Sequence, residues 1–333
     1  MDIPTHALTS YALARGFFPR RGWPVVVGML IAGTIADVDQ VSVFFGPAGY
    51  LEVHRTWTHS ILATLIVVAI AAALTFFLDK TRPTRLATML AATFAAAAVH
   101  VVMDLFQSDG ETLLWPFRST RFAADYLPGI DPWILTLLLA GILLPELFRL
   151  VGSEIGAKDK TPRGRNGALI ALALIVAYIS ARGVLHDNAT GTLDAHSYRG
   201  ESPRRLGAFP DPLSLLTWHG IAETQSLVCL VDVPVHSGQQ FDAEAANCQH
   251  KPESSPELDL AQKTAAAHKF LQSARFPRAT VERTQDGYEV VIRSLRDVVE
   301  QETSRSVAAR IVLDAKPTIF SEELVWAKEL RVR

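Results

Sequence analysis

The sequence predicts a mainly helical, polytopic membrane domain followed by a small α+β domain outside the cytoplasm. Long runs of Ala, Leu, Ile, Val and Phe fill residues 1–185, whereas the chain after His186 is polar and rich in proline. A length of 333 residues also favours two domains. We therefore assign residues 1–185 to the membrane domain, 186–205 to a linker and 206–333 to the outer domain.

About six membrane-embedded segments are expected. A transmembrane helix needs about 20 consecutive apolar residues, with about 17 as the lower limit. Four stretches meet or approach this length: Ser60–Leu78, Leu86–Phe106, Pro132–Val151 and Gly167–Leu185. Two shorter segments precede them, Pro4–Phe18 and Trp23–Ala36, and form a predicted hairpin that turns at residues 19–22.

Basic residues in the loops orient these segments. They gather in three alternating loops, which the positive-inside rule places in the cytoplasm. They are Arg20, Arg21, Lys80, Arg82, Arg85, Lys158, Lys160, Arg163 and Arg165, whereas Arg55, Arg118 and Arg121 are exceptions in the outer loops. The last segment then ends outside, so we expect a multi-pass protein of the bacterial inner membrane with an extracytoplasmic C-terminal domain.

Charge and cysteine usage narrow the partners and the compartment. The formal net charge is −2, and neither half has the basic excess of a nucleic-acid-binding protein, so we expect no nucleic acid. Cys229 and Cys248 both lie in the polar half. They permit one disulfide if that half lies outside the cytoplasm, although the sequence does not decide whether they pair.

Seven ionisable residues fall at one predicted depth of the membrane domain. His6 lies about 14 residues before the turn at Arg20, and Asp37 about 16 after it, so a rise of about 1.5 Å per residue brings both to a similar height. His59 begins a helix that runs inward, and a fourth segment that runs outward ends near Asp104. Ionisable groups at apolar helices indicate a functional site. The predicted metal ligands are His6, Asp37, Asp39, His54, His59, His100 and Asp104.

The chemistry of this set favours a divalent transition metal. His100 and Asp104 are four residues apart and share a helix face. Imidazole and carboxylate together suit zinc, with manganese or iron as alternatives, better than calcium. The number of ligands leaves room for more than one ion. Such centres polarise a phosphoryl or acyl oxygen and activate water near neutral pH.

Each residue taken alone has a simpler interpretation. A single membrane histidine can be an interfacial residue, and Asp37 and Asp39 can cap a helix or face water. Thr58 and Ser60 suit the N-cap of the third segment. Asp131 before Pro132 is typical of an N-cap and N1 pair. It is the coincidence of the seven residues at one depth that favours a metal site.

The outer loop 107–131 supplies a second set of candidates. Asp109 and Glu111 are candidate general bases, and Arg118 and Arg121 are candidate ligands for an anionic oxygen such as phosphate. The two arginines oppose the positive-inside rule, which favours a specific role. The alternative for each residue is a place in a solvated loop.

At these residues the sequence resembles a known family, the LexA-binding, inner membrane-associated hydrolases, also described as membrane-bound metal-dependent hydrolases. The resemblance covers residues 1–150. The motifs that carry it are Thr5-His6, Asp37-Val38-Asp39, the run from His54 to Ser60, His100 with Asp104, and Leu113 to Phe117 followed by Arg121-Phe122. It implies a metal-dependent hydrolase distantly similar to zinc-dependent phospholipase C. Ala36 and Thr56 replace the proline and the glycine that are usual in the family, and both changes affect local backbone geometry rather than a ligand.

The outer domain is predicted to be small and α+β. Thr217–Val235 contains β-branched runs typical of strands, and Gly238–Pro256 is loop-like. Glu257–Ser273 is predicted to be one amphipathic helix. Thr280–Arg283 and Tyr288–Ser294 form a predicted hairpin, and Val307–Leu313 another strand. The histidines of this domain lack metal-ligand spacing and are expected to be structural or exposed: His186, His196, His219, His236, His250 and His268.

Three functions fit these observations. The first is a membrane-bound hydrolase of phosphoester or lipid-linked substrates, which reach the site from the bilayer. The second is a non-enzymatic scaffold with a structural metal, whose outer domain binds a protein partner. An ion transporter ranks last, because the inner loops offer mainly Lys and Arg.

Overall fold

A computed structural model of the chain describes residues 1–20, 22–79, 85–154, 164–236, 238, 240–300 and 305–331, with the side chains of 151–154 and 331 left aside. These residues divide into two compact units. The first contains Met1–Asp39 and Arg55–Val184, and the second contains Gln40–His54 and Leu185–Arg333. The first unit is helical, and the second is built mainly from two antiparallel sheets.

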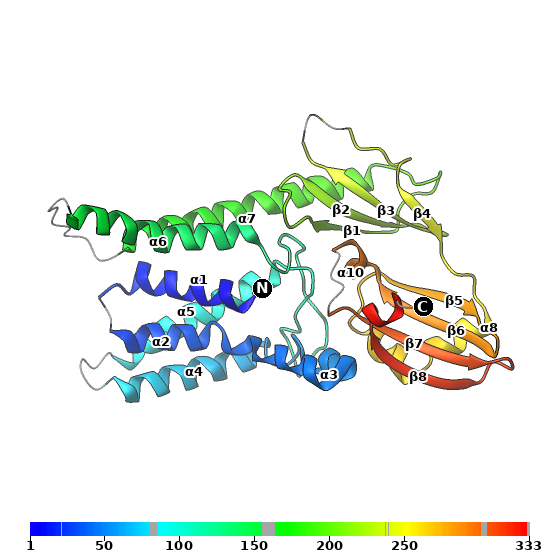
Figure 1. Cartoon of the computed structure of the whole chain (residues 1–333), viewed down its shortest axis with the longest axis horizontal. Coiled ribbons are helices and arrows are strands. Elements are labelled where there is room, and N and C mark those ends of the chain that lie inside the picture. Colours follow the sequence, from blue (N-terminus) through cyan, green and yellow to red (C-terminus); the bar gives the residue numbers. More distant parts are fainter. Residues whose placement is uncertain are drawn as a thin grey trace. The chain divides into compact units, whose positions relative to one another are not determined.

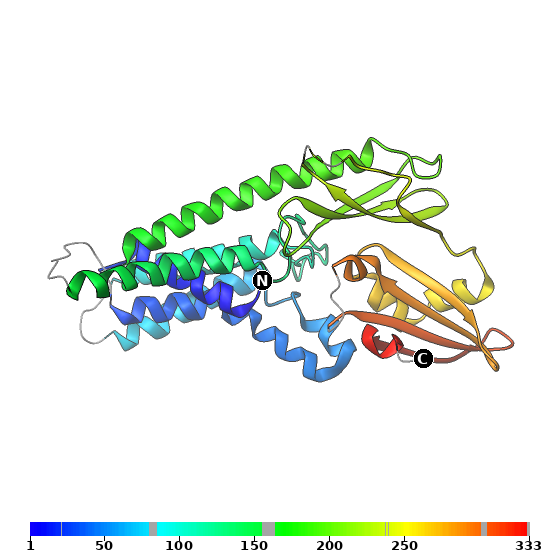
Figure 2. The same cartoon turned by 45° about the horizontal axis from the view of Figure 1, so that its top comes forward.

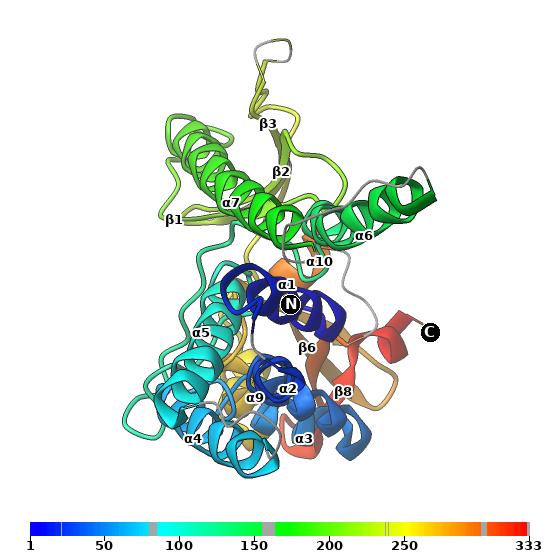
Figure 3. The ribbon, with the colours of Figure 1, turned by 90° about the vertical axis from the view of Figure 1, so that its left-hand side faces the viewer.

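Helices that lie side by side form the first unit (Figures 1 and 3). They are α1 (Ile3–Phe17), α2 (Trp23–Ala32), α4 (Ile61–Leu78), α5 (Leu86–Leu105), α6 (Pro132–Glu154) and the first part of α7 (Arg165–Asp194). A 3-10 helix, η1 (Ile35–Phe45), follows α2 and leads into α3 (Gly46–Val53), which belongs to the second unit.

Small side chains let these helices pack closely. At Gly141 of α6 an added Cβ would lie 2.7 Å from the carbonyl oxygen of Gly167 in α7, so this crossing leaves no room for a larger residue. The core between α2, α4 and α5 contains Met29, Ala72, Met89, Ala92 and Ala96, and the core between α1, α6 and α7 contains Ala12, Ile134, Leu138, Ala168 and Ile175.

Four described helices are long and apolar enough to cross a membrane: α4, α5, α6 and α7. A fifth span exists if α2 and Ile35–Val53, which are bent by 42° at a short break, count as one. With 15 residues, α1 is shorter than a span. The predicted helical membrane domain is therefore confirmed, with four or five possible spans among the six predicted segments.

The described helix ends that flank the basic loops lie at one end of the helical unit. Figure 1 shows the C-terminal ends of α1, α4 and α6 at one end of the bundle, and the start of α1 with the end of α5 at the other. Arg20 follows α1, and Arg85 and Arg165 begin the next helices at that first end. The other basic residues of these loops lie outside the described residues: Arg21, Lys80, Arg82, Lys158, Lys160 and Arg163.

Helix α7 is longer than the sequence predicted, and Figure 2 shows it as one unbroken helix. It continues to Asp194, so the first part of the predicted linker 186–205 is helical. The helix continues because Ala189 and Leu193, which are four residues apart and share a helix face, are buried against the first sheet of the second unit. The residues between them are mostly polar, so this apolar face was not recognised in the sequence.

The second unit contains two four-stranded antiparallel sheets, each with its strands in sequence order. The first contains β1 (Arg205–Pro210), β2 (Thr217–Glu223), β3 (Leu227–Pro234) and β4 (Asn247–His250). The second contains β5 (Pro277–Arg283), β6 (Gly287–Ser294), β7 (Val307–Asp314) and β8 (Ile319–Trp326). Short helices accompany them: α8 (Pro256–Gln262), α9 (Ala265–Leu271), α10 (Leu295–Val299) and η2 (Ala327–Arg331).

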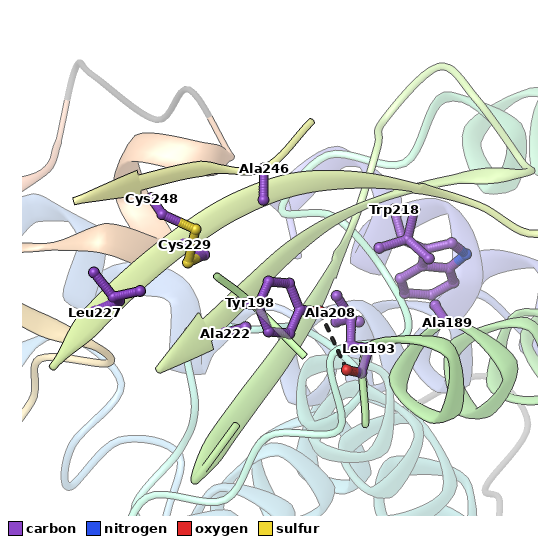
Figure 4. Close-up of a cluster of buried hydrophobic side chains, with 11 residues drawn as sticks. Ala189, Leu193, Tyr198, Ala208, Trp218, Ala222, Leu227, Cys229, Ala246 and Cys248 are labelled. Carbon is purple, nitrogen blue, oxygen red and sulfur yellow. Dashed lines mark hydrogen bonds between the residues drawn. A yellow bond between two sulfur atoms is a disulfide. The ribbon is translucent and has the colours of Figure 1, made fainter. Parts of the chain in front are cut away.

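The end of α7 and a disulfide hold the first sheet. Figure 4 shows Ala189 and Leu193 of α7 facing the sheet beside Trp218 and Tyr198. Cys229 and Cys248 lie directly opposite each other on β3 and β4 and form a disulfide. The sequence permitted this bond, and it joins β3 to a strand inside the segment predicted to be a loop.

The second sheet confirms some predictions and corrects one. The predicted hairpin is β5 and β6, and the strand predicted at Val307–Leu313 is β7. The single helix predicted over Glu257–Ser273 is instead two helices, α8 and α9. Thr264 breaks it, because its backbone is extended and its hydroxyl accepts the N–H of Ala267 as an N-cap. Strands β1, β4 and β8 were not predicted.

Candidate metal centre

Five of the predicted ligands converge at the end of the helical unit where α1 begins. His6 lies on α1, Asp37 on η1, His59 directly before α4, and His100 and Asp104 in the last turns of α5. All five side chains are buried, with at most 3% of each residue exposed. These sequence-distant groups therefore lie at one end of the helical unit, at the common depth that the helix lengths predict.

The first group of possible ligands contains His6, Asp37, His100 and Asp104. One potential donor atom from each lies within 4.8 Å of the others. The Nε2 atom of His6 is 2.9 Å from Asp104 Oδ1 and 3.9 Å from Asp37 Oδ2. The His6 and His100 rings lie 4.0 Å apart between centroids. The amino group of Met1 also contacts Asp104.

The second group contains His59, Asp104 and Glu111. The Nε2 atom of His59 is 3.4 Å from Asp104 Oδ2 and 3.7 Å from Asp37 Oδ1. Asp104 therefore belongs to both groups. Glu111 comes from the loop after α5, where its backbone exchanges two hydrogen bonds with Phe122, each 3.0 Å long.

Two of the predicted ligands lie outside both groups. Asp39 lies behind His59, with its Oδ2 atom 3.3 Å from Nδ1 of that ring. The same oxygen accepts hydrogen bonds from the Arg55 N–H (2.8 Å) and the Thr58 hydroxyl (2.6 Å). His54 is the C-cap of α3 and stacks on Tyr50 at 4.5 Å in the second unit. Spacing alone could not separate these two residues from the others.

The rings of His59 and His100 are held through one nitrogen each. His100 Nδ1 donates to the carbonyl oxygen of Gly33 at 3.0 Å, which leaves Nε2 as the nitrogen with a lone pair. In His59, Nδ1 is the nitrogen that lies beside Asp39 and the Thr58 hydroxyl. Metal-bound histidines in proteins are commonly oriented in this way by a carbonyl or a carboxylate on the second nitrogen.

Arg55 is a buried residue of the site that the sequence prediction missed. Its guanidinium donates to Gln107 Oε1 at 2.5 Å and lies 3.7 Å from Asp104 and 3.4 Å from Asp109. Only 3% of this residue is exposed. The sequence did contain an indication of this role. Arg55 is a basic residue in a predicted outer loop, against the positive-inside rule, and it lies between His54 and His59. The backbone of Arg55 has a φ of 54°, which helps place its N–H on Asp39.

The loop candidates separate into buried and exposed residues. Glu111 is fully buried and joins the second group. Asp109 is partly exposed and faces Arg55. Arg118 is exposed, and Arg121 donates to the carbonyl of Gly110 at 3.2 Å. The structure thus brings only Glu111 of these four into a metal-capable group of the described residues.

The electrostatics of the loop residues reflect a buried excess of carboxylates. Burial and the nearby Asp104 carboxylate raise the pKa of Glu111 to about 8. Burial lowers the pKa of His59, but the surrounding carboxylates, Asp104 first, outweigh it and raise this pKa well above its usual range. Both pKa values are raised because neighbouring carboxylates favour the protonated form of each group, and the same carboxylates would attract a metal cation.

Unsatisfied polar atoms show that these residues fit a metal ion. Buried polar groups are nearly always hydrogen-bonded, and exceptions call for an explanation such as an ion. Among the described residues, no hydrogen-bond partner is found for His59 Nε2, His100 Nε2 and Asp104 Oδ2, nor for Asp37 Oδ2 or either carboxylate oxygen of Glu111. A cation held by imidazole and carboxylate would satisfy them together. The cluster can therefore bind a metal ion, whose identity the donor set leaves open.

Comparisons with known proteins agree with a membrane protein. The family model described as YdjM inner membrane protein matches residues 1–189, which contain the whole cluster. The uncharacterized protein YfhP of Bacillus subtilis (strain 168) is 29% identical over 153 residues, or 43% of this chain. The match spans 46% of that relative, which is about half its length. No solved structure matches the chain. The family match covers more than half of the sequence, so the chain belongs to the YdjM inner membrane protein family.

Proposed function

We propose that this protein is a membrane-bound metal-dependent hydrolase that acts on a phosphoester or a lipid-linked substrate. The observation that carries the proposal is the convergence of five buried His and Asp side chains from α1, η1, α5 and the turn before α4. Ionisable side chains are costly beside apolar helices. A bound cation would satisfy the donor atoms of this packed cluster that have no hydrogen-bond partner.

The ion is a divalent transition metal, with zinc as the first candidate and manganese or iron as alternatives. His6, Asp37, His100 and Asp104 hold it. When bound, such an ion supplies Lewis-acid polarisation of a phosphoryl or acyl oxygen and lowers the pKa of water. Calcium suits the set less well, because two of the four donors are imidazoles.

The surrounding residues position the ligands and balance their charge. Asp39 orients His59, and the Gly33 carbonyl orients His100. Arg55 offsets the negative charge of Asp104. Asp109, on the partly exposed side of Arg55, is a candidate general base, and Arg118 and Arg121 are candidate contacts for an anionic substrate oxygen.

The proposed site lies at the outer face of the bacterial inner membrane. Two observations support this side. The helix ends that precede the basic loops meet at the opposite end of the helical unit, which the positive-inside rule assigns to the cytoplasm. The disulfide of the second unit is typical of an oxidising compartment such as the periplasm. A substrate embedded in the bilayer would reach such a site laterally.

A structural metal is the second candidate function, and the closed character of the first group favours it. Four protein ligands are typical of structural zinc sites, whereas catalytic sites keep an open position. In that case the protein is a membrane scaffold whose second unit binds a protein partner.

Metal content of the detergent-purified protein tests the proposal. We expect at least one equivalent of zinc, manganese or iron by elemental analysis, and its loss in a His59→Ala/Asp104→Ala double variant. The matched control is His219→Ala/Asp232→Ala, which removes an exposed His–Asp pair of the second unit whose atoms lie 2.8 Å apart. A folded wild-type protein that takes up none of these ions overturns the proposal.

Activity then separates the two candidate functions. A hydrolase releases product from phosphomonoester, phosphodiester or phospholipid substrates, and the double variant does not. A scaffold retains its metal, and phosphate analogues do not change the spectrum of the cobalt-substituted protein.

A further inference from the structure

We infer that the cluster forms two unequal metal positions that share Asp104. The closed position contains His6, Asp37, His100 and Asp104, and the open one contains His59, Asp104 and Glu111. The open position is where a phosphoryl or acyl oxygen of the substrate binds. This inference rests on the proposed function and gives Glu111 the role of a ligand rather than a general base.

Asp104 has the geometry of a bridging carboxylate. Its Oδ1 atom lies 2.9 Å from His6 Nε2, which belongs to the closed position. Its Oδ2 atom lies 3.4 Å from His59 Nε2, which belongs to the open one, and 3.7 Å from His100 Nε2 of the closed one. A carboxylate that lies between the histidines of both groups can be shared by two ions.

Glu111 is a buried carboxyl group that a metal ion would hold in its ionised form. It is fully buried, and neither of its oxygens has a hydrogen-bond partner among the residues that the structure describes. Two hydrogen bonds to Phe122 hold its backbone in place, which keeps the side chain in its buried position. Burying an unpaired carboxylate is costly. An ion shared with His59 and Asp104 removes that cost.

The two positions differ in the number of protein ligands. The closed position has four, the number typical of structural zinc sites. The open position has three, the number typical of catalytic sites that leave a place for water or substrate. A second cation is also repelled by the positive charge of the first, and this repulsion weakens its binding. The closed position therefore fills first, and the open position fills second with lower affinity.

Stepwise metal titration of the full-length protein tests this arrangement. After the detergent-purified protein is stripped with a chelator, zinc is added in competition with a chromophoric chelator. Manganese is added in a parallel series followed by electron paramagnetic resonance. We expect two zinc steps of unequal affinity, and a spin-coupled manganese signal only after the second equivalent, because a shared carboxylate holds the two ions close together.

Variants assign the two steps. Glu111→Gln should leave the first step unchanged and weaken the second by more than about 100-fold, beyond the usual effect of losing an outer partner. His6→Gln should weaken the first step. Asp109→Asn is the matched control, because it neutralises a carboxylate two residues from Glu111 that belongs to neither group, and both steps should persist. Circular dichroism and the apparent melting temperature verify that each variant is folded.

The outcomes separate this inference from the proposed function. One equivalent of metal that Glu111→Gln does not affect overturns the two-position arrangement but leaves a single-metal hydrolase intact. Two equal and uncoupled steps also overturn it. Absence of any bound metal overturns both proposals. Two unequal steps, with the second lost in Glu111→Gln and kept in Asp109→Asn, support it.

Discussion

Oδ2 of Asp39 lies 3.3 Å from Nδ1 of His59, while the Nε2 atom of the same ring faces Asp37 and Asp104. One imidazole thus separates a carboxylate that orients it from two carboxylates that can share an ion with it. Two aspartates of a single Asp-Val-Asp motif therefore have different roles.

Asp39→Asn is expected to keep the metal stoichiometry and to weaken affinity by about 10- to 100-fold, because the carboxylate that orients His59 is lost while every donor atom remains. Chelator competition on the purified protein measures this change. Asp37→Asn is the control and should reduce the stoichiometry itself. The opposite result, with metal lost in Asp39→Asn and retained in Asp37→Asn, would exchange the two roles.

Gly33→Ala is expected to displace the carbonyl that holds His100. An added Cβ would lie 2.0 Å from the Ser10 hydroxyl and 3.1 Å from the Met29 carbonyl, so the Ser10 side chain must move and the adjacent backbone must adjust. Overpacking of this kind costs about 1–3 kcal/mol. Thermal unfolding in detergent should show a lower midpoint, together with weaker metal binding. Gly129→Ala, where an added Cβ meets nothing within 4 Å, should match the wild type.

Arg55→Gln is expected to destabilise the metal-free protein by about 3–5 kcal/mol, because it leaves buried carboxylates without their cation. Zinc should recover part of this loss, since the ion supplies positive charge at Asp104. The measurement is the apparent melting temperature with and without zinc. Arg118→Gln removes an exposed arginine and should change neither value. Equal destabilisation by both variants would refute the charge-balancing role of Arg55.

The disulfide is expected to stabilise the second unit. Cys229 and Cys248 are 19 residues apart, and closing a loop of that size contributes about 3 kcal/mol in the chain-entropy description. The Cys229→Ala/Cys248→Ala variant should unfold at lower denaturant concentration. Protein from cells lysed under thiol-blocking conditions should resist maleimide labelling until it is reduced. Free thiols in that protein would contradict an oxidising location for this unit.

Glu201 is expected to contribute to stability in a way that depends on pH. The Ser226 and Thr224 hydroxyls and the Ser226 N–H donate to its carboxylate and lower its pKa to about 2. Because the folded-state pKa is lowered, this contribution is present above the ordinary value of 4.5 and is lost as pH falls towards 2. Glu201→Gln should flatten the change in unfolding midpoint between pH 6 and pH 3. Glu253→Gln, at an exposed position, should leave that change as in the wild type.

The helical membrane domain and the depth of the cluster could be predicted from the residues alone. Apolar runs of helical length specify spans because lipid leaves the backbone no partner but itself. The constant rise of a helix converts sequence distance into height, so residues as far apart as His6 and His100 could be placed at one level. The β5–β6 hairpin was predictable for a similar reason, because its turn and its strands are local in sequence.

Which of those residues face one another depends on how the helices and loops pack in three dimensions. Depth gives a height but no direction around the helix axis, so it could not separate Asp37 from Asp39 or place His54 on Tyr50 in the second unit. The burial of Arg55, the entry of Glu111 and the pairing of Cys229 with Cys248 depend on contacts between distant segments. Strand β4 and the extension of α7 to Asp194 are stabilised by such contacts as well, and their short polar sequences do not specify them alone.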